Sequence, residues 1–333
     1  MNPANFSAAT CTPRFIQVDK ADHAAAREEL IDGLNDAAAH TSPKFLYDAL
    51  GSRLFEAITE LDEYYPTRTE AAIFKQHAAA MAKAMGEVGT LIDLGAGNCA
   101  KAMGLMNTLK PQRYVAVDIS VDFLQDSLRT VQRAHPALDV IGVGQDFSKS
   151  LQLPADTLQG KPVFFYPGSS IGNFTPVQAL SFLTGVHEQA RNQTGQGGLL
   201  IGIDLVKATE LLQPAYDDAL GVTAAFNLNV LLHLNRLIGS NFLPRDWQHV
   251  ALFNTERSRI EMHLQARRAL TVTWKGDARE GSRKFEEGER LHTENSYKYT
   301  ADGFAALLNA AGFKSSQRWL DDKGWFAVFW AQS

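Results

Sequence analysis

The sequence has little cysteine and no long apolar run. Its 333 residues include two cysteines, Cys11 and Cys99, which give neither a disulfide framework nor the spacing of a metal site. No unbroken apolar stretch is long enough to span a bilayer, and the first fifteen residues lack the apolar core of a signal peptide. We therefore expect no bound metal, no membrane partner and a reducing, cytoplasmic location.

Charge of one sign is not concentrated anywhere along the chain. The formal net charge is −5 and no long basic run occurs, so nucleic acid is not an expected partner. Internal repeats and low-complexity segments are also missing. Hydrophobic residues make up 45% of the chain and charged residues 21%, a balance that allows a sizeable core. The length indicates one large or two ordinary domains.

The stretch 90–118 has the pattern of a nucleoside-binding unit. Residues 90–94 form a short apolar run that predicts a buried strand, and Gly95 and Gly97 follow it in a tight turn. A helical pattern comes next, and then a second strand, 114–117, which ends on Asp118. In an α/β sheet this order places a ligand at the carboxyl ends of the strands, with the acid on the ribose hydroxyls. We interpret it as a site for S-adenosylmethionine (SAM).

Two other interpretations of the glycine turn stay open at this point. It also fits the G-x-G-x-x-G/A pattern of dinucleotide sites, and it could be a purely structural turn, with Cys99 as a small packing residue. A third strand, 140–144, is followed by Asp146 and Phe147. The carboxylate can accept from the adenine amine and the ring can cover the base, which favours SAM.

The next strands supply the place where an acceptor would meet this donor. Strand 163–166 runs into the loop 167–176, PGSSIGNFTP, which contains Gly168 and Asn173. Such a loop at the carboxyl end of a central strand is a usual position for substrate, although Asn173 alone could be a turn residue. The Thr-Pro pair that ends the loop predicts the start of a helix.

The α/β alternation breaks after the strand 198–204. Residues from about 205 to 297 form a long insertion with a helix ending near Leu237, strand-like segments at 249–253 and 259–264, and a charge-rich hairpin over 275–290. The chain then closes with a helix and two strands, 315–320 and 325–330. A closing antiparallel hairpin on a parallel sheet is typical of SAM-dependent methyltransferases and again disfavours a dinucleotide.

The aromatic segment 42–68 has two interpretations. Ser42 and Pro43 predict a helix start, and Pro66 must end any helix that precedes it. Most aromatic clusters belong to a core. The alternative is a helical lid whose tyrosine hydroxyls face a pocket.

The ordered motifs of this chain resemble the histidine Nα-methyltransferases of ergothioneine biosynthesis, from about residue 42 to the end. The resemblance is carried by SPKFLYDALGSRLFEAITELDEYYPTRTEAAIF (42–74), DLGAGNCAK (93–101), PGSSIGNFTP (167–176), IGIDLVK (201–207), AYDDALGVTAAFNLNVL (215–231), IEMHL (260–264) and TENSYK (293–298). One departure is Asp93, where relatives carry Glu; either acid can serve there.

The resemblance implies an α/β fold with two parts. A Rossmann-like class I methyltransferase sheet, parallel with a C-terminal antiparallel hairpin, would comprise residues 67–205 and 297–333. An inserted α+β substrate domain would comprise residues 1–66 and 206–296. The implied activity is conversion of L-histidine to its Nα,Nα,Nα-trimethyl betaine, hercynine, with three SAM, as the first committed step of the pathway. A monomer acting on a small molecule is expected.

The resemblance also implies a set of site residues. SAM would lie on Gly95, Gly97, Lys101, Asp118, Asp146 and Phe147. The substrate would contact Tyr64, Asn173, Tyr216, Met262, Glu294 and Ser296, with its carboxylate on Asn173 and Tyr216 and its imidazole on the others. The reaction centre would be formed by Tyr47, Phe55 and Gly168, with Tyr47 orienting the amine.

A carboxylate and a hydroxyl can bind both imidazole nitrogens and reject side chains that lack them. Three other functions remain as alternatives: methylation of another amino acid or amine, a non-catalytic SAM-binding protein, and a nicotinamide oxidoreductase.

Overall fold

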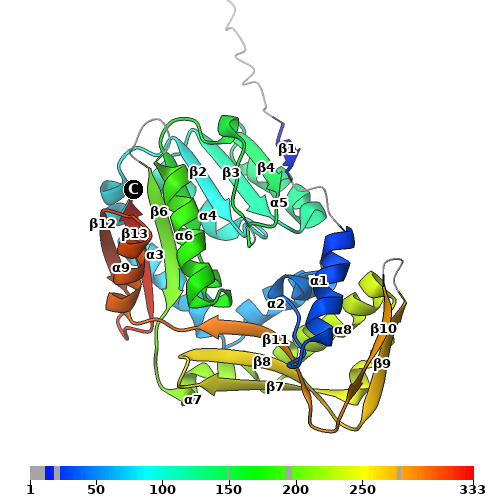
Figure 1. Ribbon diagram of the computed structural model, residues 1–333. Coiled ribbons are helices and arrows are strands. Elements are labelled where there is room, and N and C mark those ends of the chain that lie inside the picture. The colour runs from blue at the N-terminus through cyan, green and yellow to red at the C-terminus, as the bar shows by residue number, and fades with distance from the viewer. Residues whose placement is uncertain (1–11, 19–22, 149, 192–196, 276–278) are drawn as a thin grey trace, which may run out of the picture.

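The computed structural model describes residues 12–18, 23–148, 150–191, 197–275 and 279–333. Its largest element is an eight-stranded sheet of order β1-β4-β3-β2-β5-β6-β13-β12 (Figure 1). The strands are β1 Arg14–Gln17, β2 Thr90–Leu94, β3 Arg113–Asp118, β4 Asp139–Gly144, β5 Pro162–Tyr166, β6 Gly198–Asp204, β12 Ser315–Leu320 and β13 Phe326–Gln332. In this order, each of the first six strands is parallel to its neighbours among those six. Strand β13 is antiparallel to both β6 and β12. The predicted parallel sheet with a closing hairpin is therefore confirmed.

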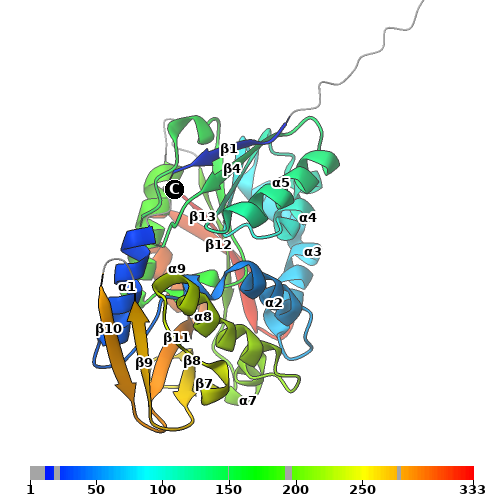
Figure 2. The same cartoon turned by 90° about the vertical axis from the view of Figure 1, so that its right-hand side faces the viewer.

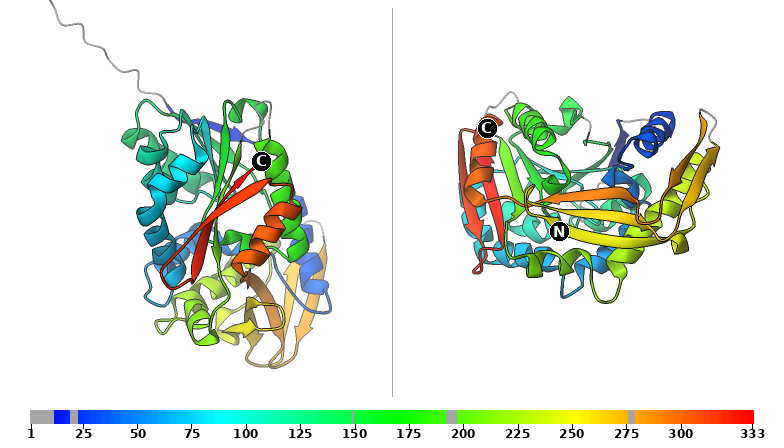
Figure 3. Two further views of the ribbon diagram at one scale, coloured as in Figure 1. Left: turned by 90° about the vertical axis from the view of Figure 1, so that its left-hand side faces the viewer. Right: turned by 60° about the horizontal axis from the view of Figure 1, so that its bottom comes forward.

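Helices cover both faces of this sheet because each presents an apolar side to it. One face is packed by α3 Tyr65–Met85, α4 Ala100–Leu109 and α5 Val121–Ala134. The other is packed by α6 Pro176–Ala190 and α9 Ala301–Ala310 (Figure 3). The expected helix start at Thr175 is a complete capping box, in which Thr175 and Gln178 bond each other's backbone N–H groups.

A second layer lies beyond the carboxyl ends of the parallel strands (Figures 1 and 2). Its three-stranded sheet, order β11-β8-β7, consists of β7 Trp247–Asn254, β8 Arg259–Ala266 and β11 Arg290–Tyr297. Around it are the hairpin β9 Leu270–Lys275 and β10 Glu280–Phe285, and the helices α1 His23–Asn35, α2 Ala49–Thr59, α7 Thr209–Leu212 and α8 Val222–Ile238. Short 3-10 helices are η1 Pro43–Leu46, η2 Ala155–Thr157, η3 Ser170–Asn173, η4 Pro214–Tyr216 and η5 Pro244–Asp246.

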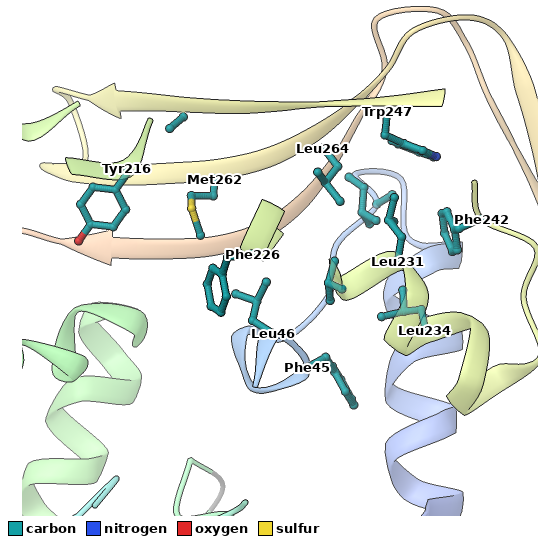
Figure 4. Close-up of a cluster of buried hydrophobic side chains, with 14 of the residues drawn as sticks. Phe45, Leu46, Tyr216, Phe226, Leu231, Leu234, Phe242, Trp247, Met262 and Leu264 are labelled. Atoms are coloured by element: carbon teal, nitrogen blue, oxygen red, sulfur yellow. The ribbon is translucent and has the colours of Figure 1, made fainter. Parts of the chain in front are cut away.

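The second layer has a hydrophobic core of its own. This core joins the N-terminal helices to the insertion, and it is distinct from the two cores on the faces of the large sheet. Segments far apart in sequence thus share one buried cluster, part of which is shown in Figure 4. Among the described residues, no helix is both long and apolar enough for a membrane span.

The structure differs from the sequence interpretation at four places. Strand β1 was not predicted; it pairs with β4 in the large sheet, although it belongs to the segment 1–66 assigned to the substrate domain. The helix expected from Pro43 is only the 3-10 turn η1, because the chain turns at Tyr47 and Asp48, where the Asp48 carboxylate accepts from Gly51 N at 2.7 Å and begins α2. Pro66 starts α3 instead of ending a helix, since α2 has already ended at Thr59. Strand β11 was also not predicted.

Candidate active site

The glycine turn after β2 is held by the acid that follows β3. Gly95 and Gly97 have positive φ angles of 67° and 51°, a backbone that side chains rarely tolerate. Gly97 N donates to Asp118 Oδ2 at 2.9 Å, and Ser120 N donates to Oδ1 at 2.8 Å. Burial raises the pKa of Asp118, while these backbone donors oppose the shift. The turn and the acid are therefore fixed to each other before any ligand binds.

Phe147 meets this turn from the next strand. A Cβ built on Gly95 would lie 3.8 Å from Phe147 Cζ, and the ring packs against Tyr166 and Phe182 with centroids 5.9 Å away in both cases. The carboxyl ends of β2, β3 and β4 thus bring together the residues that the sequence places around an adenine.

Asp146 is tied to the second layer. Its Oδ2 lies 3.0 Å from Lys44 Nζ, which also contacts Glu29 Oε2 at 2.8 Å. Burial opposes ionisation of Asp146, but hydrogen bonds from Ser148 and Lys44 outweigh it and lower the carboxyl pKa. Asp146 is therefore ionised at neutral pH.

A buried glutamate joins the predicted Lys101 and Gly168. Glu70 of α3 is 1% exposed; its Oε2 accepts from Lys101 Nζ at 2.6 Å and its Oε1 accepts from Gly168 N at 2.8 Å. Gly168 has φ +78°, and a Cβ there would lie 2.9 Å from Lys101 Nζ. Sequence reasoning missed Glu70, which is part of the aromatic-rich motif but has an ordinary helical setting.

One cavity between the large sheet and the second layer contains every residue predicted to contact substrate or form the reaction centre. These are Tyr47, Phe55, Tyr64, Gly168, Asn173, Tyr216, Met262, Glu294 and Ser296. Its other lining residues, not predicted, are Ile58, Ser169, Ser170, Ala215, Thr223 and Phe226. The first group comes from five separate segments of the chain, so the fold alone brings its members together.

Aromatic rings form one wall of the cavity. Phe55 lies with its centroid 5.6 Å from Tyr47, 6.1 Å from Tyr64 and 6.0 Å from Phe226. Figure 4 shows Phe226 on the side toward which Met262 of β8 and Tyr216 of η4 project. Both interpretations of the aromatic segment therefore apply, because these rings belong to a core and also line the cavity. Burial, and then the nearby Glu294, raise the pKa of Tyr47 well above 10.

A β-bulge directs two polar side chains into the cavity. In the β11–β8 pairing, His292 is opposite His263 but Glu294 is opposite Met262, so Thr293 is the extra residue. A bulge changes which side chains face the core, and here Glu294 and Ser296 both become buried. Burial raises the pKa of Glu294 to about 7, while the charge of Lys298 opposes the shift.

Behind the polar end of the cavity lies a buried charge network. Lys298 Nζ contacts Tyr216 Oη at 2.8 Å, Ser296 Oγ at 2.9 Å and Asp204 Oδ2 at 2.8 Å. Asp204 also pairs with Lys207 at 2.5 Å and accepts from Tyr65 Oη at 2.7 Å. The motifs IGIDLVK and TENSYK contain these three charged residues, but nothing in their spacing showed that they meet.

Tyr216 is also held through its backbone. His249 Nε2 lies 2.8 Å from the Tyr216 carbonyl, and Asn227 Nδ2 lies 2.9 Å from His249 Nδ1. An amide N–H must donate to Nδ1, so Nε2 carries the proton and donates to the carbonyl. Burial lowers the pKa of His249, consistent with a neutral ring.

Asp93 and Cys99 lie beneath the glycine turn. Asp93 accepts from Tyr114 Oη at 2.7 Å, and burial raises its pKa to about 7. Cys99 is buried with φ 60° at the start of α4 and is a free thiol. Both side chains pack in the interior, as expected for Cys99.

A family model described as "Histidine-specific methyltransferase, SAM-dependent" matches residues 26–333. The chain belongs to this family. The histidine N-alpha-methyltransferase of Mycolicibacterium smegmatis is 36% identical over 319 residues, covering 94% of this chain and 96% of that protein. The ergothioneine biosynthesis protein 1 of Neurospora crassa is 29% identical over 286 residues, covering 82% of this chain and 31% of that one.

Among solved structures, a SAM-dependent methyltransferase from Clostridium acetobutylicum matches with a TM-score of 0.43 and 11% identity, covering 85% of this chain and 96% of that one. The family membership and the topology agree with the sequence prediction of a SAM-dependent methyltransferase, which is confirmed. The methyl donor is SAM.

Proposed function

We propose that this methyltransferase converts L-histidine to hercynine by three methylations of the α-amino nitrogen. The observation that carries the proposal is the cavity in which all nine residues expected around the acceptor lie together. A carboxyl group and a hydroxyl on adjacent inward positions of one strand are suited to the two nitrogens of an imidazole. The family description and the histidine methyltransferase relatives support the same acceptor.

The donor would lie on the glycine turn. In this proposal Asp118 holds the ribose hydroxyls, Asp146 and Phe147 hold the adenine, and Gly95 and Gly97 let the backbone approach. Lys101, whose ammonium lies next to Gly168, would contact the end of the donor opposite the adenine. The residues fit such a ligand because the positive-φ turn, the fixed acid and the aromatic ring meet at the carboxyl ends of β2, β3 and β4.

The acceptor would be bound at both ends. Asn173 and Tyr216 would hold its carboxylate, and Tyr64, Glu294 and Ser296 its ring, with Met262 alongside. A ligand without ring nitrogens would leave Glu294 and Ser296 unpaired in a buried site, at a cost of roughly 1–3 kcal/mol for each group. The site would therefore select histidine by its polar ring atoms.

The bound donor supplies a methyl group on a positively charged sulfur. The chain's task is to hold the amine in line with it. Tyr47 would orient the amine by a hydrogen bond, and Phe55 and Gly168 would line a space that accepts the added methyl groups. The nitrogen must lose one proton before each transfer, and the high pKa of Tyr47 makes water a better acceptor for that proton than a phenolate.

We also propose that the chain works as two units and supplies ergothioneine biosynthesis. The separate core of the second layer supports a substrate domain made of the N-terminal segment and residues 206–296, with β1 excluded because it lies in the large sheet. The relatives named for ergothioneine biosynthesis support the pathway. Hercynine would be its first committed intermediate.

The test is mass spectrometry of the enzyme with SAM and histidine. We expect mono-, di- and trimethylhistidine to appear in turn, with one S-adenosylhomocysteine per methyl group. Phenylalanine, a similar side chain without ring nitrogens, serves as the matched substrate control and should remain unmethylated. Methylation of another amino acid in place of histidine, or release of no S-adenosylhomocysteine with either, would overturn the proposal.

A further inference from the structure

The Lys298 ammonium has no hydrogen left for a ligand. An ammonium group has three N–H donors, and Lys298 lies within hydrogen-bond distance of Asp204, Tyr216 and Ser296. The Lys298 side chain is fully buried, with 0% exposure. Each hydroxyl of Tyr216 and Ser296 therefore accepts one hydrogen from it.

The two hydroxyls then have a single hydrogen to offer the cavity. Tyr216 Oη and Ser296 Oγ lie 2.7 Å apart, so one of their two hydrogens lies between them. If Tyr216 donates to a substrate carboxylate, Ser296 must donate to Tyr216. Ser296 Oγ then has one lone pair left and no free hydrogen, so it can only accept a hydrogen bond from the ligand. A ring nitrogen facing Ser296 must therefore carry a hydrogen.

The other ring nitrogen faces Glu294. With one ring N–H already directed at Ser296, this second contact also needs a hydrogen, either on the nitrogen or on the carboxyl oxygen. We propose that the Tyr216–Ser296 hydrogen bond, in the network that Lys298 donates to, makes Ser296 an acceptor, so that the bound histidine ring and Glu294 hold one proton beyond the ring's own N–H. This inference rests on the proposed function, because it uses Tyr216 as the carboxylate donor.

The surroundings of Glu294 are suited to a shared proton. The residue is 7% exposed, and among the described residues no hydrogen-bond partner of its carboxyl group is found. The titratable groups that interact electrostatically with it are the Lys298 ammonium and the hydroxyls of Tyr47, Tyr64 and Tyr216. The Lys298 charge is already paired with Asp204. A proton between Glu294 and the ring would therefore avoid an uncompensated buried charge.

The consequence is proton uptake on binding at alkaline pH. An unbound imidazole has a pKa of about 6.5, and the pKa of Glu294 is raised to about 7, so at pH 8.5 neither holds the extra proton before binding. The complex must take it from solution. Affinity should then fall by about tenfold for each pH unit above that range, as linkage requires for one proton.

The probe is hercynine, whose quaternary nitrogen has no proton to lose and so cannot mask the effect. Calorimetry of hercynine binding to the full chain with S-adenosylhomocysteine, at pH 8.5 in Tris and in phosphate, measures proton uptake from the difference in heat. We expect about one proton per hercynine and a dissociation constant that rises with pH. Buffer-independent heat together with a flat pH profile would overturn the inference.

Two variants locate the proton. In Glu294→Gln the amide N–H can donate to the ring nitrogen, so no extra proton is needed. In Tyr216→Phe the Ser296 hydroxyl no longer donates to Tyr216 and can donate to the ring. Proton uptake should therefore disappear in both variants. The exposed Glu60→Gln is the matched control and should keep it. Uptake that persists in both site variants would contradict the assignment. Hercynine that forms and binds without uptake overturns this inference alone, whereas failure to form hercynine from histidine overturns the proposed function.

Discussion

At the scale of single residues, Tyr47 shows how burial limits chemistry. Its ring lies in the aromatic wall of the cavity, where burial and the nearby Glu294 raise the pKa of its hydroxyl well above 10. The group therefore stays a phenol throughout the working pH range. It can orient an amine but does not provide a phenolate base.

We expect Tyr47→Phe to slow methylation by roughly 2- to 10-fold, the value of one hydrogen bond, and to shift products toward mono- and dimethylhistidine. The pH profile of kcat should keep its shape, because no titrating group is removed. Mass spectrometry of product ratios against time is the measurement. An unchanged product ratio would contradict the orienting role, and a lost pH limb would contradict the phenol state.

Gly168 is a second residue whose identity is imposed by its surroundings. Its φ is +78° and an added Cβ would approach Lys101 Nζ to 2.9 Å. Gly168→Ala should raise the KM for SAM by about tenfold or more, because strain of roughly 1–3 kcal/mol displaces the loop. Gly185→Ala, in the middle of α6 where a Cβ would meet nothing within 4 Å, is the control and should keep the wild-type KM. Steady-state kinetics at saturating histidine distinguishes them.

At the scale of elements, the predictable parts of this molecule are those whose pattern is local. The strand, glycine turn and helix from Thr90 and the closing hairpin follow from apolar runs and turn residues, and both were predicted. Strand β1 was missed because its four residues, RFIQ, show no alternation of polar and apolar side chains, and the strand is recognised only by its pairing with β4. The position of Glu294 inside the cavity came only from the resemblance, since residue spacing does not reveal a bulge.

The same limit explains the missed charge network. Lys298, Asp204 and Lys207 would be expected at the surface from composition, and they are buried because they neutralise one another. Lys207 pairs with Asp204 three residues before it, whereas Lys298 reaches Asp204 from a segment distant in sequence. Glu70 is similar, since its partners Lys101 and Gly168 come from later segments. Pairing over long sequence separations is a property of the fold and cannot be inferred from local patterns.

The bulge in β11 gives a prediction at this scale. Deleting Asn295 would let β11 pair regularly with β8, because Thr293 would then lie opposite Met262 and Glu294 would take the outward position opposite Glu261. Histidine binding should fall by about tenfold or more, the loss of one polar contact of roughly 1.5–3 kcal/mol. S-adenosylhomocysteine should still bind, because the large sheet has its own cores.

Thr293→Ser is the control for that deletion. It keeps the bulge and the hydroxyl that donates to the Met262 carbonyl at 3.0 Å, so histidine affinity should remain near wild type. Calorimetry with each ligand separately measures both affinities. A deletion variant that binds histidine normally would contradict the bulge as the device that aims Glu294, and one that loses S-adenosylhomocysteine as well would contradict the independence of the two halves.

At the scale of the whole molecule, the donor side and the second layer are joined by side-chain contacts close to both sites. Lys44 pairs with Asp146 at 3.0 Å, Ser120 Oγ donates to the Tyr47 carbonyl at 3.2 Å, and Asn98 Nδ2 donates to Glu56 at 2.9 Å. Each contact links a residue beside the glycine turn or adenine position to the segment that forms the aromatic wall. Ordering one side should therefore help to order the other.

This linkage predicts positive coupling between the two substrates. Histidine should bind more tightly when S-adenosylhomocysteine is present, and the reverse effect must have the same size, because coupling free energy is reciprocal. Allosteric couplings are typically about 5- to 150-fold, and Lys44→Met should reduce the observed factor by about 2- to 10-fold. The half-buried Lys44 is the best point to test because it contacts Asp146 directly.

The measurement is a thermodynamic square, with histidine affinity determined with and without S-adenosylhomocysteine in wild type and variant. Lys284→Met, at an exposed lysine of the β9–β10 hairpin paired only with Glu286 among the described residues, is the control and should keep the full coupling. Removal of Lys44 also leaves Asp146 without a cation that lowers its pKa, so the affinity for S-adenosylhomocysteine should weaken further as pH falls toward the Asp146 pKa. Equal coupling in wild type and Lys44→Met would show that Lys44 only stabilises the fold and that communication between the sites runs through the other contacts.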